Sequence, residues 1–309
     1  GIFEPIDDKV VAEKGFKAED YIKVPWEAGI YQGKRYAIPL DVPQHLLYMN
    51  EKLIKEAGLD PKKPPTTKDE LFANAKKVTK GDEIFGFVHG TPNYTWAFHN
   101  WLWQNGTDVF TPDLKKAAVN EPAGVEVAEL LASLRNDLKI SPPGGVNLRD
   151  AFLAGKTAYW WAGSWNLTGL PEMKFEWSVA PTPNFFKQPL VWTISHNYVF
   201  PKPKTKDDAR RDAAWTHIQW IRDNVQDWTA LAGQISAYKK AHDDPKVTSN
   251  GPAKVLLAQA PNWRTAPPTV KWTKAESLQR PILEKVYLGQ AKPKDAMDDL
   301  AKQINAIPD

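Results

Sequence analysis

Three polar side chains interrupt an apolar run in the stretch IPLDVPQHLLYMN, which spans residues 38–50. They are Asp41, Gln44 and His45. Removing a polar group from water costs about 1–3 kcal/mol unless it finds a hydrogen-bond partner, so a polar break in a buried segment indicates a binding site. Two purely structural interpretations stay open. The stretch can be a loop between a strand and a helix, or Asp41 can cap the helix that follows.

The remaining reactive residue types form no recognisable catalytic or metal constellation. The chain has no cysteine, which excludes thiol catalysis, disulfides and thiolate metal sites. None of its six histidines pairs at the spacing of a helical zinc site, and no P-loop, GxGxxG or GxSxG pattern occurs. We therefore expect a protein that is not an enzyme, with no catalytic residues, no metal and no cofactor.

Length, composition and charge indicate a globular protein and argue against some classes of binding partner. With 309 residues, 42% of them hydrophobic and 25% charged, the chain is long enough for two compact lobes with real cores. A net charge of +3 and the absence of long Lys/Arg blocks make nucleic acid a poor partner. No apolar run reaches membrane-spanning length and no signal pattern opens the sequence, so we expect a cytosolic protein or a mature exported one.

The 14 tryptophans are the strongest compositional signal. Indole offers a flat apolar face and one hydrogen-bond donor, which suits sugar rings because their C–H faces stack on aromatics while their hydroxyls need hydrogen bonds. Most of these residues must still belong to the core. Trp160 and Trp161 are adjacent in a strand-like run, so they point to opposite faces and at most one can reach a site.

Local patterns alternate between helix and strand. A capping box, Thr67 followed by Glu70, opens one helix, and Pro293 marks the start of another. The expected helices lie within residues 64–79, 121–137, 207–224 and 293–307. The expected strands lie within residues 84–89, 157–163, 177–182 and 192–200. This alternation predicts an α/β protein with helix-covered sheets.

Three motifs, in their order and spacing, resemble the solute-binding proteins of carbohydrate ABC importers, the maltose-binding-protein type. They are WEAGIYQGKRYAIPLD, LLYMNEKLIKEAGLDPKKPPTTKDEL and AFLAGKTAYWWAGSWNL. The resemblance implies a two-lobed α/β fold of the type II periplasmic-binding-protein (Venus-flytrap) class, with a hinge between the lobes. It places residues 1–41 and 196–245 in lobe one and residues 42–195 and 246–309 in lobe two.

Members of that family carry a longer N-terminal region, and GIFEPIDD here matches the piece that normally follows it. The resemblance therefore implies that lobe one is incomplete in this chain, through truncation or because a separate N-terminal fragment completes it. It also implies a periplasmic or extracellular location, including that of a cell-surface lipoprotein.

The resemblance nominates ligand-binding residues one by one. Residues 38–41 match the first crossing between lobes, which puts Asp41, Gln44 and His45 at the cleft. Trp165, in GSW, falls on the main stacking tryptophan of the family, with a core indole as the alternative. The other nominees come from HGTPNYTW, WTISHNYVF and APNWRTAPPTVKWTKAE, and are Thr91, Asn93, Tyr94, Trp192, Ser195, His196, Trp272 and Glu276.

Some of these assignments depart from the family pattern or fit an ordinary structural role equally well. The maltose binder carries an acidic and an aromatic residue where this chain has Thr91 and Asn93, and Pro92 suits a simple turn. A structural histidine is as good an interpretation of His196 as a ligand contact.

The predicted function is the substrate-binding component of an ABC sugar importer. It would bind a mono- or oligosaccharide between its lobes and deliver it to the membrane permease. Asp41 would accept hydrogen bonds from paired hydroxyls, and Trp165 would stack on a ring. Three alternatives stay open: a glycoside hydrolase or other carbohydrate-active enzyme, a binding protein for a peptide, polyamine or phosphodiester, and a scaffold that binds nothing by itself.

Overall fold

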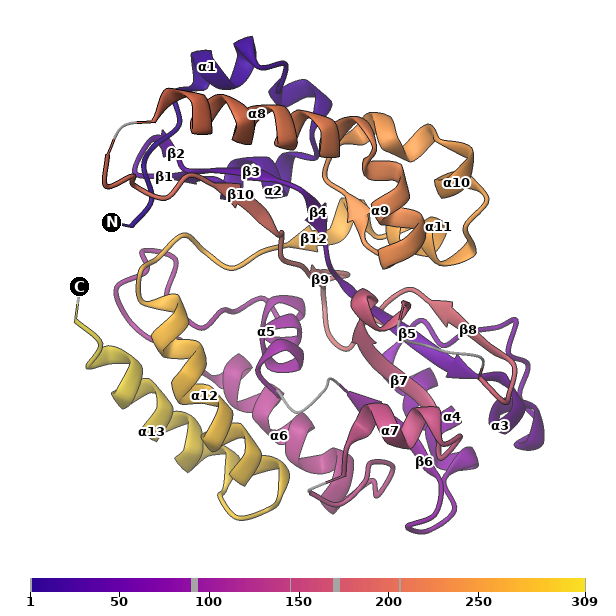
Figure 1. Ribbon diagram of the computed structural model, residues 1–309. Helices are drawn as coiled ribbons and strands as arrows, with labels where there is room; N and C mark the ends of the chain where they lie inside the picture. Colours follow the sequence, from indigo (N-terminus) through magenta and orange to yellow (C-terminus); the bar gives the residue numbers. More distant parts are fainter. Residues whose placement is uncertain (1, 90–93, 145, 169–172, 206, 309) are drawn as a thin grey trace. The chain divides into compact units, whose positions relative to one another are not determined.

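The computed structural model describes residues 2–89, 94–144, 146–168, 173–205 and 207–308 (Figure 1). Contacts between residues divide the chain into two compact units, which are described one at a time. Unit 1 comprises Gly1–Gln44, Ser164–Gly169 and Thr193–Pro268, and unit 2 comprises His45–Gly163, Leu170–Trp192 and Thr269–Asp309. Each unit is therefore built from segments that lie far apart in the sequence.

Unit 2 contains a four-stranded sheet with the strand order β6-β7-β5-β8. The strands are β5 (His45–Asn50), β6 (Phe85–His89), β7 (Thr157–Gly163) and β8 (Trp177–Ala180). β5 runs antiparallel to β7 and β8, whereas β6 runs parallel to β7. Every residue of β5, β6 and β7 is buried, as expected for strands that are covered on both faces. A short strand, β9 (Val191–Trp192), also belongs to this unit.

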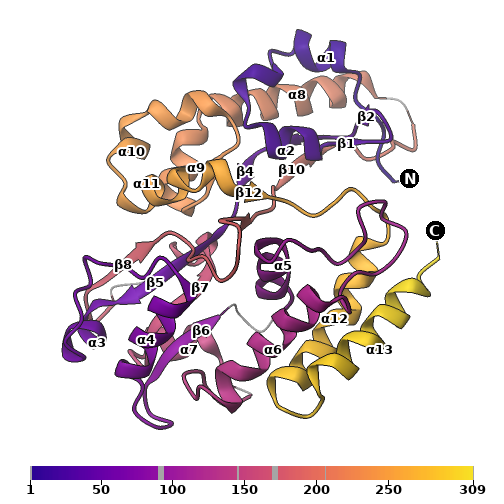
Figure 2. The ribbon, with the colours of Figure 1, turned by 180° about the vertical axis from the view of Figure 1, so that it is seen from behind.

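The helices of unit 2 form two groups, of which one covers the sheet. Helices α3 (Glu51–Glu56), α4 (Lys68–Val78) and α7 (Leu148–Leu153) contact the strands directly. A second group packs mainly on itself, and Figures 1 and 2 show it gathered to one side of the sheet. Its members are α5 (Tyr94–Gln104), α6 (Pro122–Asn136), α12 (Trp272–Tyr287) and α13 (Pro293–Asn305).

Unit 1 is held by short strand pairs rather than by one broad sheet. β3 (Ala37–Pro39) pairs antiparallel with β10 (Asn197–Val199), and β4 (Asp41–Val42) pairs antiparallel with β11 (Ile235–Ser236). β1 (Ile30–Tyr31) and β2 (Lys34–Arg35) form a hairpin, and β12 (Trp263–Arg264) completes the strands of this unit.

Among its described residues, unit 1 has six α-helices, one of which contributes to an aromatic core. They are α1 (Asp8–Glu13), α2 (Lys23–Ala28), α8 (Asp208–Asp223), α9 (Val225–Ala232), α10 (Pro245–Thr248) and α11 (Gly251–Ala258). Trp215 of α8 is buried and contacts Phe16 and Phe200, with ring centroids 5.8 and 5.1 Å away. The fold thus brings residues from the first and last segments of unit 1 into one core.

The expected helices and three of the expected strands are confirmed, whereas the run 192–200 is divided between β9, which ends at Trp192, and β10 (Asn197–Val199). The capping box is present, because Glu70 N donates to Thr67 Oγ1 at 3.3 Å and the Glu70 carboxylate accepts from Thr67 N. Pro293 lies in the first turn of α13.

The two structural interpretations of residues 38–50 are wrong. These residues form β3, β4 and β5, not a loop that leads into a helix. The next helix begins at Glu51 and is capped by Asn50, whose Oδ1 accepts from Leu53 N at 3.2 Å.

The units differ from the predicted lobes at four segments, residues 42–44, 164–169, 193–195 and 246–268. The resemblance predicted all four for lobe two, but they lie in unit 1, and residues 246–268 are the longest of them. Helix α11 contacts α10 and β11, and its Ala253 and Leu256 are buried. A helical pattern shows which face is apolar but not which part of the chain covers that face.

Helix α4 approaches β6 closely at Gly86. A Cβ atom added there would lie 2.1 Å from the backbone oxygen of Ala75. We expect Gly86→Ala to lower the free energy of unfolding by about 1–3 kcal/mol, because backbone atoms must move apart. Urea denaturation followed by tryptophan fluorescence measures the change. Gly251→Ala is the matched control, since nothing lies within 4 Å of its added Cβ. Equal midpoints for the two variants would contradict the close approach.

Candidate functional site

The predicted site residues are distributed over both units. Unit 1 holds Asp41, Gln44, Trp165, Ser195 and His196. Unit 2 holds His45, Tyr94, Trp192, Trp272 and Glu276. Thr91 and Asn93 lie outside the described residues.

Asp41 is the centre of a hydrogen-bonded cluster in unit 1. Its Oδ1 accepts from the backbone N–H of His196 at 3.1 Å and lies 2.9 Å from the ring Nδ1 of the same residue. Its Oδ2 lies 3.0 Å from that Nδ1 and accepts from the indole Nε1–H of Trp228 at 2.8 Å. Because a carboxylate can only accept, Nδ1 is the ring nitrogen of His196 that carries a proton. The Asp41 side chain itself is fully buried.

This contact changes the titration of the groups around Asp41. The hydrogen bond to Asp41 raises the pKa of His196 above its usual value, partial burial opposes the rise, and the negative charge of Asp41 adds to it. Burial, with a further contribution from the same charge, raises the pKa of Tyr198 to about 12. His196 is the member of this cluster that can change its charge near neutral pH.

Trp228 was not among the predicted residues. It lies on α9, whose Val225 and Thr229 are buried, while Trp228 itself is 41% exposed. The sequence around it shows an ordinary amphipathic helix, which gives no reason to separate this indole from the core tryptophans. Its hydrogen bond to a residue 187 positions away identifies it only in three dimensions.

Gln44 links three elements inside unit 1. Its Oε1 accepts from Gln259 Nε2 and from Trp263 Nε1, both at 2.8 Å. Its Nε2 has no acceptor among the described residues. A ligand contact by Gln44 would therefore use the amide nitrogen rather than the oxygen.

The remaining two predicted residues of unit 1 have local contacts. Ser195 Oγ donates to the backbone oxygen of His196 at 3.0 Å. Trp165 is half-buried in the short 3₁₀ helix Ser164–Asn166, and Thr168 Oγ1 donates to its backbone oxygen at 3.1 Å.

Unit 2 gathers indole rings around His45. The His45 ring stacks on Trp161 at 4.3 Å and contacts Trp192 at 4.9 Å and Trp96 at 6.1 Å, measured between centroids. Trp96 and Trp192 stack on one another at 5.1 Å with an interplanar angle of 28°. Burial lowers the pKa of His45 to about 3, so this imidazole is neutral at physiological pH.

Glu276 lies at the edge of this cluster. Its Oε1 accepts from Trp96 Nε1 at 3.0 Å and from Thr95 Oγ1 at 3.5 Å. Burial raises the pKa of Glu276, and the two hydrogen bonds oppose the rise. Trp96, which sequence reasoning missed although its neighbour Tyr94 was nominated, thus joins His45, Trp192 and Glu276 in one arrangement.

Trp272 and Tyr94 lie in different surroundings. Trp272 contacts His99 and Phe110, with centroids 4.7 and 6.4 Å away. Tyr94 contacts His89 and Tyr287 at 5.6 and 4.9 Å, and burial is the main cause that raises its pKa to about 12.

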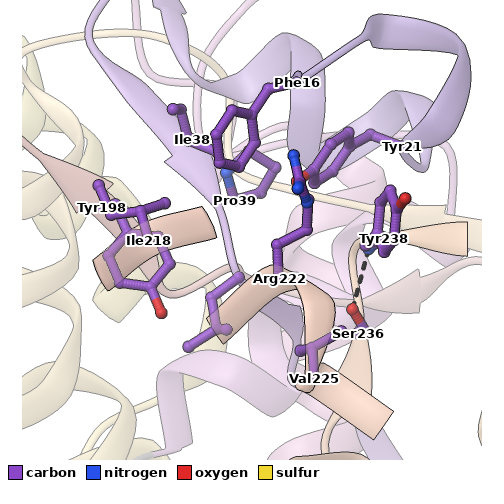
Figure 3. Close-up of a pocket in the computed structure, with 11 residues that line it drawn as sticks. Phe16, Tyr21, Ile38, Pro39, Tyr198, Ile218, Arg222, Val225, Ser236 and Tyr238 are labelled. Carbon is purple, nitrogen blue, oxygen red and sulfur yellow. Dashed lines mark hydrogen bonds between the residues drawn. The ribbon is translucent and has the colours of Figure 1, made fainter. Parts of the chain in front are cut away.

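A separate pocket lies in unit 1 beside β3 (Figure 3). Its empty volume is about 230 Å³, which includes space open to solvent, and its lining is largely aliphatic and aromatic. Arg222, its charged lining residue, donates from Nε to Asp223 Oδ1 at 2.8 Å and from NH1 to Gly15 O at 2.9 Å. Its guanidinium also lies 4.8 Å from the ring centroid of Phe16. With that charge engaged, the remaining polar side chains that line the pocket are Tyr21, Tyr198, Ser236 and Tyr238.

The described residues contain neither a metal-binding cluster nor a membrane-spanning helix. No group of three or more His, Asp or Glu side chains among them is arranged to hold a metal ion. No helix in the same part of the chain has both the length and the apolar character needed to cross a membrane.

A sequence profile of the bacterial extracellular solute-binding proteins matches residues 1–228 of this chain. The chain belongs to this family. This solute-binding protein is 24% identical over 323 residues to a putative binding protein of Brucella abortus, covering 99% of this chain and 75% of that protein. It is 31% identical over 157 residues to the sn-glycerol-3-phosphate-binding periplasmic protein UgpB of Agrobacterium fabrum, covering 44% of this chain and 33% of that protein.

Solved structures confirm the two-lobed solute-binding fold class. The substrate-binding protein Lmo0181 of Listeria monocytogenes, in complex with cycloalternan, superposes with a TM-score of 0.86 at 20% identity. That match covers 99% of this chain and 80% of the Listeria chain. Maltose-bound MalE3 of T. maritima gives a TM-score of 0.83 at 22% identity, over 98% of this chain and 80% of the MalE3 chain.

The Asp41–His196 contact predicts a pH-dependent stability. Because folding raises the His196 pKa, the stabilisation is complete below the unfolded value of about 6.5 and is lost as pH rises through the folded value. We expect wild type to exceed His196→Gln in unfolding free energy by more at about pH 5.5 than at about pH 8.5. Denaturant titrations at both pH values measure the difference. His217→Gln, on the exposed surface of α8, controls for loss of an imidazole elsewhere. A pH-independent difference would contradict the assignment.

Proposed function

We propose that this solute-binding protein binds a mono- or oligosaccharide and delivers it, chemically unchanged, to the membrane permease of an ABC importer. The observation that carries the proposal is the arrangement in unit 2. The stacked Trp96–Trp192 pair lies beside Glu276, whose carboxylate accepts from the Trp96 indole. Trp96 and Glu276 are only half-buried, so an aromatic surface and an acceptor are accessible side by side. Sugars need both.

The ligands of related proteins support a sugar. Similar structures carry cycloalternan, α-D-tagatose and maltose, which differ widely in size. A maltotriose-binding protein of Pyrococcus abyssi is 22% identical over 261 residues, covering 81% of this chain and 54% of that protein. We propose ligand contacts in unit 1 from Gln44, Trp165, Ser195 and His196, while the buried carboxylate of Asp41 acts through the groups that it holds. In unit 2 we propose contacts from His45, Tyr94, Trp192, Trp272 and Glu276, with Trp96 added.

A glycoside hydrolase is disfavoured by how the candidate carboxylates are used. Such an enzyme needs an acid and a second carboxylate that flank one bond. Asp41 is held by His196 and Trp228, and Glu276 is held by Trp96 and Thr95. Each carboxylate is thus engaged as an acceptor, which suits binding without turnover. Family membership agrees with this role and supports a periplasmic or extracellular location.

A phosphorylated solute is the second candidate. The similarity to UgpB favours it, as does the structure of UgpB from Mycobacterium tuberculosis in complex with glycerophosphocholine, which superposes with a TM-score of 0.85. A phosphate is best recognised by bidentate arginine, whereas the cluster at Asp41 offers one histidine. We therefore rank a sugar first. The separate N-terminal fragment expected from the sequence stays a prediction.

Titration with a panel of mono- and oligosaccharides, together with sn-glycerol-3-phosphate, tests the proposal. We expect one sugar to produce a saturable change in tryptophan fluorescence. It should also stabilise the fold by about 2.7 kcal/mol at a concentration of one hundred times Kd. Chromatography should recover the sugar unchanged.

Trp165→Ala should weaken binding of that sugar by roughly tenfold, about 1.4 kcal/mol, because a stacking surface is lost. Trp220→Ala is the matched control, since Trp220 is 63% exposed on α8 and is not a proposed contact. Release of a product would show an enzyme. Binding of sn-glycerol-3-phosphate alone would replace the sugar with the second candidate.

A further inference from the structure

In the Asp41 cluster, the side chains that a ligand can reach are not the one that the sequence predicted as the acceptor. That prediction made Asp41 itself the acceptor for sugar hydroxyls. In the structure both carboxylate oxygens already accept from N–H groups of His196 and Trp228. A carboxylate offers about four acceptor positions, and three N–H groups make four contacts with this one, because Nδ1–H of His196 is shared between the two oxygens. With its side chain fully buried, Asp41 has no remaining surface for a ligand.

The two side chains that Asp41 holds are accessible. The side chain of His196 is 59% exposed, and Trp228 is 41% exposed. Both rings direct a nitrogen at the same oxygen, Asp41 Oδ2, so they are neighbours. Hydrogen bonds to a buried acceptor fix the orientation of both rings before any ligand arrives, which reduces the ordering cost of binding.

The chemistry left on this surface is that of a sugar contact. Nδ1 of His196 is used by Asp41, and Nε2 takes no hydrogen bond from the rest of the described chain. A neutral imidazole accepts a hydroxyl proton at Nε2, and a protonated one donates there, so a sugar hydroxyl satisfies either form. The exposed indole of Trp228 supplies an apolar surface next to it.

We propose that Trp228 and His196 form a sugar-binding subsite on unit 1, in which Asp41 is a positioning residue rather than a ligand contact. This inference rests on the proposed function. Trp228 packs against the apolar face of a sugar ring, His196 Nε2 hydrogen-bonds to one of its hydroxyls, and Asp41 holds both rings in place.

A protein-docking face is the competing interpretation of an exposed tryptophan. Leu231, three residues further along α9, is 77% exposed and lies on the same side of the helix. If α9 served as an apolar docking face, Leu231 and Trp228 would be equivalent. The subsite differs because only Trp228 is anchored to Asp41 beside a polar ring.

The test compares binding affinities of full-chain variants by isothermal titration calorimetry, using the sugar that binds wild type best in the panel. We expect Trp228→Ala to raise Kd about tenfold, about 1.4 kcal/mol. Trp228→Phe keeps an aromatic surface and should raise Kd only a few-fold, while Leu231→Ala should leave it unchanged. Thermal melting of each variant confirms that the chain is folded.

Nuclear magnetic resonance of ¹⁵N-labelled tryptophan tests the role of Asp41. The Trp228 indole resonance, assigned by its loss in Trp228→Phe, should shift when the sugar is added. Asp41→Asn should move this resonance in the free protein, because the Trp228 indole is no longer held by a carboxylate. The same variant should bind the sugar more weakly.

Each adverse outcome is distinct. Wild-type affinity in Trp228→Ala, together with weakened binding in Trp165→Ala, would overturn the subsite and leave the proposed function standing. Equal losses in Leu231→Ala and Trp228→Ala would overturn it in favour of a general apolar face. Failure of wild type to bind any sugar would overturn the proposed function itself.

Discussion

The buried carboxylate of Asp41 connects segments of unit 1 that lie far apart in the sequence. His196 lies 155 positions and Trp228 187 positions beyond Asp41, yet both donate to it. An ionised group removed from water is tolerated only when donors replace the lost hydration. Three N–H groups do so here, with one of them shared between the two oxygens. β4, the start of β10 and helix α9 are therefore held in one relation by the need to satisfy this charge.

Three other tryptophans also donate their indole N–H to a polar side chain. Trp96 donates to Glu276, Trp263 to Gln44 and Trp161 to Thr182, each at 2.8–3.0 Å. An indole anchored at its nitrogen cannot rotate freely, so its ring becomes a rigid surface. Some of these rings, such as Trp161, end in the core, and others, such as Trp96 and Trp228, keep part of the ring accessible. The chain thus uses one residue type both for packing and for presenting flat surfaces.

Features that depend on contacts between residues close in the sequence could be predicted, whereas features that depend on distant segments could not. The start of α4 was readable because Thr67 and Glu70 cap it within one turn. The opposite orientations of Trp160 and Trp161 follow from strand geometry, and the structure confirms them: Trp160 packs on Tyr48 and Trp161 on His45. The importance of position 41 was also visible, because a lone acid in an apolar run must have a partner. Which partner it has was not visible, since His196 and Trp228 meet it only through the pairing of distant segments. For the same reason Trp228 and Trp96 went unnoticed.

The division of unit 1 into three pieces has a consequence for how the chain folds as it leaves the ribosome. β3 is made early, but its partner β10 lies beyond the whole first stretch of unit 2. Strands β5, β6, β7 and β8 all emerge within residues 45–180, so their sheet can pair first. The ends of the inserted stretch 45–163 are joined when Ser164 N donates to Gln44 O at 2.8 Å. Folding of this stretch therefore shortens the loop between β3 and β10, and it lowers the closure entropy that this pairing costs. The first stretch of unit 2 in this way brings two segments of unit 1 together before unit 1 is complete.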